Sequence, residues 1–252
     1  MENKKLRYYE QLGSTNTTLS ELAWEGAEHG TVVVAGCQTN GRGRRGRLWE
    51  SPAGDNIYMS ILLRTGVATE KAPMLTLVMA YSVAKVLQDK GFPDVQIKWP
   101  NDLVLSGKKV CGILTEMYLQ GTAIDYIVVG VGLNVNTSVF PEELVDKATS
   151  LFLECGKLLD KEQLIVDMVE TFMIMYDKFA QEGNLEFLQE AYNAILVNKD
   201  REVRILEPEN DYTAYAHGIN GNGELVVQLE NGTEKNVYAG EVSVRGVCGY
   251  IR

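Results

Sequence analysis

The chain has 252 residues, of which 45% are hydrophobic and 23% charged, and its formal net charge is −10. That length is enough for one large domain, or for one domain with a smaller one beside it. The composition is ordinary for a globular protein, and no apolar run approaches the ~18 residues of a membrane span. Residues 1–5 are polar and contain no signal-peptide core, so the sequence predicts a cytoplasmic protein. The four cysteines and two histidines are too far apart for a usual zinc or redox motif.

Helical and extended patterns are interspersed in the part of the chain before residue 200. Ser14-Thr15-Asn16 begins a helical stretch, and Gly30 is its predicted stop. Asp160 and Gln163 resemble a capping pair at the start of a long helix. The predicted strands are 31–36, 57–63, 95–99, 109–118 and 126–133, and the further helices are 72–90, 160–183 and 185–196. We expect these elements to form the main domain.

From about residue 200 the pattern changes to short, closely spaced strands. They are predicted at 202–206, 212–218, 225–229, 234–237 and 242–245. Asn220-Gly221-Asn222-Gly223 and Asn231-Gly232 between them are hairpin signals. So short a segment can bury only a marginal core. We therefore expect a small barrel that packs on the main domain.

The segment 38–47 concentrates positive charge in an otherwise acidic chain. Four arginines and three glycines lie between Gly41 and Arg47. Glycine lets a backbone approach a ligand closely, and arginine offers a planar fork that matches carboxylate and phosphate groups. The pattern predicts a mobile loop that closes over a small anion. The alternative is a solvated basic loop without a ligand.

Two further groups of residues have a structural and a functional interpretation. Ser14-Thr15-Asn16 either caps a helix or satisfies the polar edge of a ligand. Gln38 and Trp49 flank the arginine loop, where Trp49 is either a packing residue or a shield for a nucleotide. The sequence alone leaves these alternatives open.

Residues 98–102, Lys-Trp-Pro-Asn-Asp, precede a strand that Lys109 opens. Lys109 is either a surface lysine or a cation held over a reacting carboxylate. Asp102 either forms an Asx turn or binds Mg²⁺ together with substrate phosphates. Residues 130–134, Gly-Val-Gly-Leu-Asn, are not a dinucleotide fingerprint, because no third glycine and no helix follow. Their glycines permit close approach of a flat ligand, and Asn134 could then read an adenine edge.

In this order, Ser-Thr-Asn, Q-x-x-G-R-G-R-R-G-R, K-W-P-N-D, K-x-x-G-I-L and G-x-G-x-N resemble the motifs of biotin–protein ligases, also called biotin–[acetyl-CoA-carboxylase] ligases. The resemblance covers essentially the whole chain. It implies an α/β fold of class II synthetase-like type, with a mixed sheet flanked by helices and a small C-terminal SH3-like β-barrel. The implied domains are 1–198 and 199–252. Because the motifs begin by residue 14, it also implies the monofunctional class without an N-terminal DNA-binding domain. Asn40 stands where such enzymes often have a small residue, which bears on the geometry of the loop.

The reaction that the resemblance implies has two steps. The biotin carboxylate attacks the α-phosphate of ATP, which gives biotinyl-5′-AMP and pyrophosphate. A lysine of a biotin carboxyl carrier protein, from acetyl-CoA carboxylase or another biotin-dependent carboxylase, then attacks the mixed anhydride. Mg²⁺ is expected with ATP, but its ligands cannot be named. DNA and membranes are not expected partners, and both a monomer and a homodimer are compatible with the family.

The resemblance also implies roles for individual residues. The catalytic set is Lys109, Arg44 and Asp102. The biotin-binding set is Ser14, Thr15, Asn16, Gln38, Gly41, Arg42, Gly43, Arg44, Lys109 and Gly112. The set around ATP and the adenylate is Arg42, Arg44, Arg45, Arg47, Trp49, Lys109, Gly130, Gly132 and Asn134.

Two other functions remain open. A lipoate–protein ligase shares the fold and the chemistry, but the polar Ser-Thr-Asn set and the arginine loop favour biotin. A nucleic-acid-binding module would use the arginine loop differently. The net acidity and the lack of aromatic residues within that loop argue against it.

Overall fold

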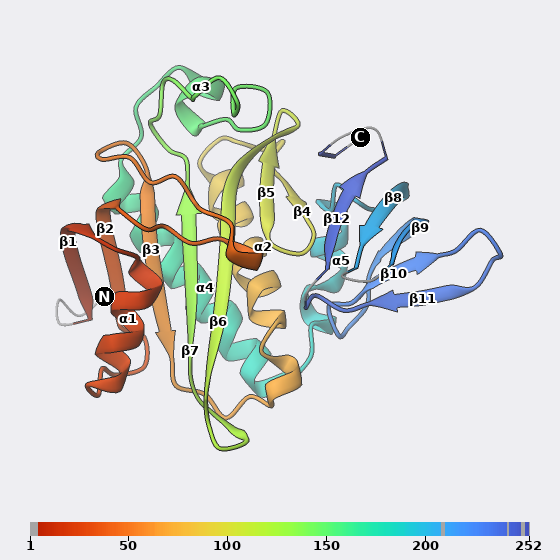
Figure 1. The fold of residues 1–252 in the computed structure, drawn as a ribbon, viewed down its shortest axis with the longest axis horizontal. Coiled ribbons are helices and arrows are strands. Elements are labelled where there is room, and N and C mark those ends of the chain that lie inside the picture. Colours follow the sequence, from red (N-terminus) through yellow and green to blue (C-terminus); the bar gives the residue numbers. More distant parts are fainter. Residues whose placement is uncertain (1–4, 208–209, 241, 248–249, 252) are drawn as a thin grey trace.

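The computed structural model describes residues 5–207, 210–240, 242–247 and 250–251 (Figure 1). Cys248 therefore lies outside the described residues. The strands of the first sheet are β1 (Leu6–Leu12), β2 (Val32–Gln38), β3 (Ile57–Leu63), β4 (Gln96–Lys98), β5 (Asp102–Leu105), β6 (Lys108–Gln120) and β7 (Ala123–Leu133). The helices are α1 (Thr15–Trp24), α2 (Met74–Asp89), α3 (Leu151–Cys155), α4 (Lys161–Glu182) and α5 (Glu186–Ala194). Short 3₁₀ turns occupy Arg44–Gly46 and Thr69–Lys71.

The first sheet has seven strands in the order β1-β2-β3-β7-β6-β5-β4. Strands β1 and β2 are parallel, and the other neighbours are antiparallel. The predicted mixed sheet is therefore confirmed. β3 lies near the middle and is buried along its whole length, as its nearly unbroken apolar sequence predicts for a strand covered on both faces.

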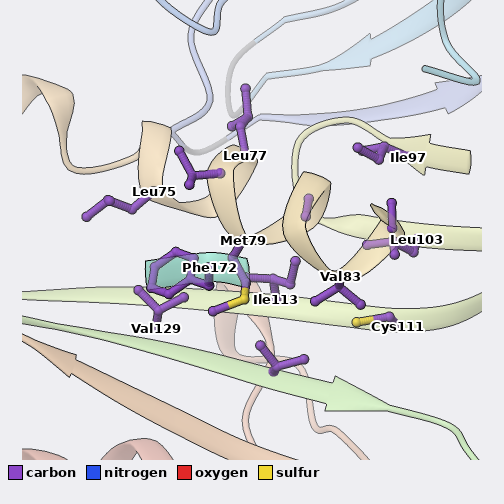
Figure 2. Packing of buried hydrophobic residues seen from close by; sticks show 14 of the residues in the cluster. Leu75, Leu77, Met79, Val83, Ile97, Leu103, Cys111, Ile113, Val129 and Phe172 are labelled. Carbon is purple, nitrogen blue, oxygen red and sulfur yellow. The ribbon is translucent and has the colours of Figure 1, made fainter. Parts of the chain in front are cut away.

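Helices cover both faces of this sheet (Figure 1). On one face, Leu19 and Ala23 of α1 pack with Leu62 and Val128. On the other face, α2 and α4 form the larger core, in which Met79 and Phe172 lie beside alternate strand residues such as Val129 (Figure 2). The change of face from Val128 to Val129 follows from the two-residue period of a strand.

Asp160 caps α4, since its carboxylate accepts hydrogen bonds from the backbone N–H groups of Glu162 and Gln163. Gln163 does not complete a reciprocal capping box, because its side chain donates to Asp167. Gly183, in the left-handed conformation at φ 66°, ends the helix as predicted. The predicted end of α1 at Gly30 is wrong. The chain turns at Gly26, with φ 96°, and α1 ends at Trp24.

The second sheet comprises β8 (Arg201–Leu206), β9 (Asp211–Ile219), β10 (Leu225–Gln228), β11 (Glu234–Val237) and β12 (Ser243–Gly246). It is antiparallel, in the order β11-β10-β9-β8-β12. Within the described residues no ladder joins β11 to β12, so the sheet does not close into the predicted SH3-like barrel. Its apolar side chains join the core of the main domain, and this packing buries them without closure of the sheet on itself.

Three elements were not expected from the sequence: β1, β5 and α3. β1 is largely exposed, and β5 has only four residues. In the described part of the chain, no helix has the length and apolar character needed to cross a membrane.

Candidate functional site

One pocket gathers the motifs at strand ends of the main sheet, and the β12 segment of the second sheet forms part of its wall. Its lining contains every site residue that the sequence predicts except Gly41 and Asn134. Ladder register explains part of this convergence. Asp102 lies opposite Gly112, and Gly112 lies opposite Gly132, so three adjacent strands contribute one row to the pocket.

One end of the pocket is a closed network of polar side chains. The Gln38 Oε1 atom accepts hydrogen bonds from the Thr15 backbone N–H (2.8 Å) and hydroxyl (3.2 Å). The buried Ser60 hydroxyl lies 2.8 Å from Thr15 Oγ1 and donates to Asn16 Oδ1 at 2.6 Å. Ser14 precedes α1 but makes no side-chain capping bond to it. The capping interpretation of this motif therefore does not account for its side chains.

Gly130 leaves room for the side chain of Asn16 to lie against strand β7. A Cβ atom at residue 130 would overlap the Asn16 amide oxygen. The Asn16 amide nitrogen also donates to the Leu114 carbonyl (3.3 Å) and to Glu116 Oε2 (2.7 Å). The Asn16 side chain is thus fixed by contacts on both its oxygen and its nitrogen.

The arginine loop folds over the pocket and is held at several points. Arg44 donates to Asn101 Oδ1 (2.9 Å), to the Val242 carbonyl (3.0 Å) and to the Gly240 carbonyl. Arg42 pairs with Glu116 at 2.7 Å. Arg45 adopts the left-handed conformation with φ 57°, which is strained for a residue with a side chain. These contacts link the loop to both sheets, and the predicted mobility of the ligand-free loop stays a prediction.

Trp49 covers the floor of the pocket. A Cβ atom on Gly132 would lie 2.5 Å from its indole nitrogen, and one on Gly112 would lie 2.8 Å from its ring. Only glycine at both positions allows this close packing. The Lys109 ammonium is 5.0 Å from the Trp49 ring centre. The indole N–H is buried and has no hydrogen-bond partner among the described residues.

The other end of the pocket carries buried charges. Lys109 Nζ lies 2.6 Å from Asp102 Oδ1, and the Tyr250 hydroxyl lies 2.5 Å from Asp102 Oδ2. Burial alone would raise the pKa of Asp102, but the ion pair with Lys109, the nearby positive charge of Lys98 and the hydrogen bonds from Lys109 and Tyr250 hold it below its ordinary value. Asp102 is therefore an ionised carboxylate.

Lys98, at the end of β4, is only 6% exposed. Burial lowers its pKa from 10.5 to about 8, although the nearby Asp102 carboxylate favours the charged form. Its ammonium lies over the ring of Tyr250, 4.3 Å from the ring centre. Lys98 is thus a second cation at this end, and it loses its charge at a lower pH than an ordinary lysine, near pH 8.

Among the described residues, no group of three or more His, Cys, Asp or Glu side chains is placed to hold a metal ion. Asp102, the predicted candidate, directs one oxygen to Lys109 and the other to Tyr250. Both oxygens of Asp102 are therefore already in polar contacts.

Two predicted site residues lie outside the pocket lining. Asn134 is buried, and its side chain donates to the Thr149 carbonyl at 3.1 Å. It thereby fastens the end of β7 to the segment before α3. The Gly41 carbonyl accepts a hydrogen bond from the Trp49 backbone N–H at 3.0 Å, which joins the two ends of the arginine loop.

Several residues of the site were missed by the sequence analysis. Ser60 was detectable from the sequence, since it is the one polar residue in an otherwise apolar strand. Lys98 belongs to a recognised motif but was given no role. The remaining contributions come from Glu116 and from Ser243, Val244, Arg245 and Tyr250 near the end of the chain. No local pattern marks the last four.

Comparison with known proteins agrees with this geometry. A model of the biotin/lipoate A/B protein ligase family matches residues 8–134, and a model of the biotin protein ligase C-terminal domain matches residues 200–245. The bifunctional ligase/repressor BirA of Bacillus subtilis (strain 168) is 35% identical over 243 residues, which cover 95% of this chain and 74% of that protein. The chain belongs to the biotin protein ligase family. The resemblance seen in the sequence motifs is thereby confirmed, and the chain is a ligase.

Two further relatives support the same assignment. The structure of the biotin protein ligase from Aquifex aeolicus in complex with biotin and ATP superposes with a TM-score of 0.85. It is 31% identical in sequence and covers 96% of this chain and 99% of its own. The biotin–[acetyl-CoA-carboxylase] ligase of Mycobacterium tuberculosis is 38% identical over 153 residues, which are 59% of this chain and 55% of that protein.

Proposed function

We propose that this ligase attaches biotin to a specific lysine of a biotin carboxyl carrier protein, in an ATP-dependent reaction through biotinyl-5′-AMP. One observation supports this most directly. A single pocket joins a closed polar network at one end to three cations at the other, the buried Lys98 and the half-buried Arg44 and Lys109. Biotin has the same polarity, with a ureido ring at one end and a carboxylate at the other.

The polar end suits the ureido ring. A buried ureido group without partners would cost about 1–3 kcal/mol for each polar atom, so several donors and acceptors are needed. Ser14, Thr15, Asn16 and Gln38 supply them, and Ser60 holds two of these side chains in place. A preformed network also reduces the entropy lost on binding.

The cationic end suits adenylation. The carboxylate of biotin would meet the α-phosphate of ATP near Lys109, with Arg44 and Lys98 beside it. Negative charge shifts among the phosphate oxygens during phosphoryl transfer, and fixed cations stabilise it without reorganisation. No protein nucleophile is needed, because the carboxylate of biotin attacks directly.

For Asp102 we propose a supporting role. Its oxygens are engaged by Lys109 and Tyr250, so we assign it to orienting the Lys109 ammonium. Mg²⁺ usually binds through substrate phosphates with few protein ligands, and we expect it to enter with ATP. The second step, attack by the carrier lysine on the anhydride, would occur at the same end of the pocket.

The deciding experiment is biotin-dependent exchange of labelled pyrophosphate into ATP. Biotin should support exchange, and lipoate at the same concentration should not. Equal or faster exchange with lipoate would show that the chain uses the other substrate class of its family. A filter-binding assay with RNA and DNA at several salt concentrations addresses the remaining alternative. Salt-sensitive retention of nucleic acid without any exchange would refute the ligase proposal.

A further inference from the structure

The last described residues of the chain return to the pocket of the main domain. The Tyr250 hydroxyl contacts Asp102, and the ring of Tyr250 covers the Lys98 ammonium. Ile251 lies against the turn between β5 and β6, where a Cβ atom on Gly107 would be 3.3 Å from its methyl group. The tail is thus attached to β4, to β5 and to the turn that leads into β6.

Tyr250 and Lys109 hold opposite oxygens of the same carboxylate. Lys109 Nζ is 2.6 Å from Oδ1 of Asp102, and the Tyr250 hydroxyl is 2.5 Å from Oδ2. An aspartate carboxylate rotates easily about its terminal bond unless both oxygens are engaged. The hydroxyl of Tyr250 therefore fixes the plane in which Asp102 presents Oδ1 to Lys109.

The direction of this hydrogen bond follows from the charges. Burial raises the pKa of Tyr250 well above its ordinary value, and the Asp102 carboxylate raises it further. Cations around Asp102, from Lys109 on β6, Lys98 on β4 and Arg44 in the loop, favour its ionised form. Tyr250 is consequently the donor and Asp102 the acceptor, which makes this a strong, charge-assisted hydrogen bond.

We propose that Tyr250 is a positioning residue for adenylation, which acts through Asp102 to fix the ammonium of Lys109 where carboxylate and α-phosphate meet. The inference rests on the proposed function. It assigns a role in the first chemical step to a residue outside the motifs and beyond the second sheet. On this proposal the hydroxyl of Tyr250 controls the geometry of the ion pair between Asp102 and Lys109.

Tyr250→Phe tests this role with little other change. The variant keeps the ring over Lys98 and removes only the hydroxyl. Groups that orient a reacting cation or metal ligand are typically worth 10–100-fold in activity. We therefore expect kcat for biotin-dependent pyrophosphate exchange to fall roughly 10- to 100-fold, with KM for biotin unchanged, since the polar end of the pocket is untouched.

Tyr238→Phe is the matched control. Tyr238 also bonds the main domain from the C-terminal part of the chain, through its hydroxyl and the Glu70 carbonyl at 2.8 Å, but it lies outside the pocket lining. Its loss should leave kcat unchanged. Equal kcat in Tyr250→Phe and the wild type would overturn the proposal. An equal loss in both variants would also overturn it, since that pattern indicates loosened packing.

A second measurement does not depend on ligase activity. In a chain with ¹³C-labelled aspartate side chains, the Asp102 signal can be assigned through Asp102→Asn and titrated. Tyr250→Phe should raise the pKa of Asp102, because a hydrogen bond that favours the carboxylate is lost. An unchanged pKa would overturn the contact itself. If Tyr250→Phe raises the pKa of Asp102 but the wild type catalyses no exchange, the contact stands and the proposed function is refuted, and with it the role in adenylation.

Discussion

Lys109→Ala is the most informative single change in the site. The ammonium of Lys109 lies between the Trp49 ring and the Asp102 carboxylate, on the wall of the pocket where adenylation is proposed. The change removes a fixed cation from the place where charge develops. By comparison with the loss of one oxyanion-stabilising donor, adenylation should slow by roughly 10²–10³-fold, or about 2.7–4 kcal/mol.

The same change should also reduce stability. It leaves Asp102, whose side chain is 12% exposed, without its closest cation. Breaking a buried ion pair typically costs about 3–5 kcal/mol. Here Tyr250 still donates to the carboxylate and Lys98 lies nearby, so we expect about 1–3 kcal/mol. For a chain of this size that corresponds to a fall in Tm of about 2–4 °C per kcal/mol.

Two variants separate these effects. Lys108→Ala removes the neighbouring lysine, which is not part of the pocket lining and donates to the Val145 carbonyl at 2.8 Å. It should leave pyrophosphate exchange within a few-fold of wild type. The double change Lys109→Ala with Asp102→Asn removes the unpaired charge, so Tm should recover while exchange stays slow.

The assay is biotin-dependent pyrophosphate exchange at saturating biotin and ATP, with Tm measured on the same preparations. A larger loss of exchange in Lys108→Ala than in Lys109→Ala would show that the wrong lysine has been assigned to the site. Recovery of exchange in the double variant would show that Lys109 matters only by neutralising Asp102. Either result would refute the reasoning.

Further predictions concern other parts of the pocket. Because the pKa of Lys98 is about 8 in the folded chain and 10.5 ordinarily, KM for ATP should rise as pH increases through 8, and this rise should be absent in Lys98→Met. The unfolded chain holds the Lys98 proton up to higher pH, so the wild type should gain stability relative to Lys98→Met between about pH 8 and 10.5, as measured by denaturant unfolding at each pH. Arg44→Gly should weaken retention of biotinyl-5′-AMP, because the loop then closes less well over the intermediate. Blots for biotin should detect more labelling of an unrelated lysine-rich protein than with wild type. Equal labelling and equal retention would contradict the closing role of the loop. Ser60→Ala removes the donor to Asn16 and should raise KM for biotin about 5- to 30-fold, equivalent to about 1–2 kcal/mol, with little change in kcat, so a pure kcat effect would disprove a role in biotin binding.

The sequence predicted the convergence of the motifs better than the shape of the second sheet. Gly112 and Gly132 could be placed at strand positions from local pattern, and antiparallel pairing then brought them opposite each other. The barrel prediction failed because hairpin signals specify neighbouring strands but not closure. Closure depends on which surface buries the apolar face, and here the main domain provides that surface.

β1 was missed for a related reason. Most of its residues are exposed, so the strand has no alternating apolar face that a sequence pattern could show. Its backbone pairs in parallel with β2, and α1 lies between the two strands in the chain. Such pairing is decided by backbone hydrogen bonds at a sheet edge, to which side-chain periodicity gives no guide.

The residues that complete the site differ in how far they lie from their partners along the chain. Ser60 lies in an apolar strand and could be recognised there as out of place. Tyr250 is 148 residues from Asp102, in a segment without a motif, and its hydroxyl acquires a role only when the tail packs against β5. Motif reading finds groups that touch the ligand, because those groups occur in local sequence patterns. Groups that orient these ligand-contacting residues can come from any element that the fold brings near. Tyr250, which contacts Lys109 only through Asp102, is such a group, and only the structure shows it.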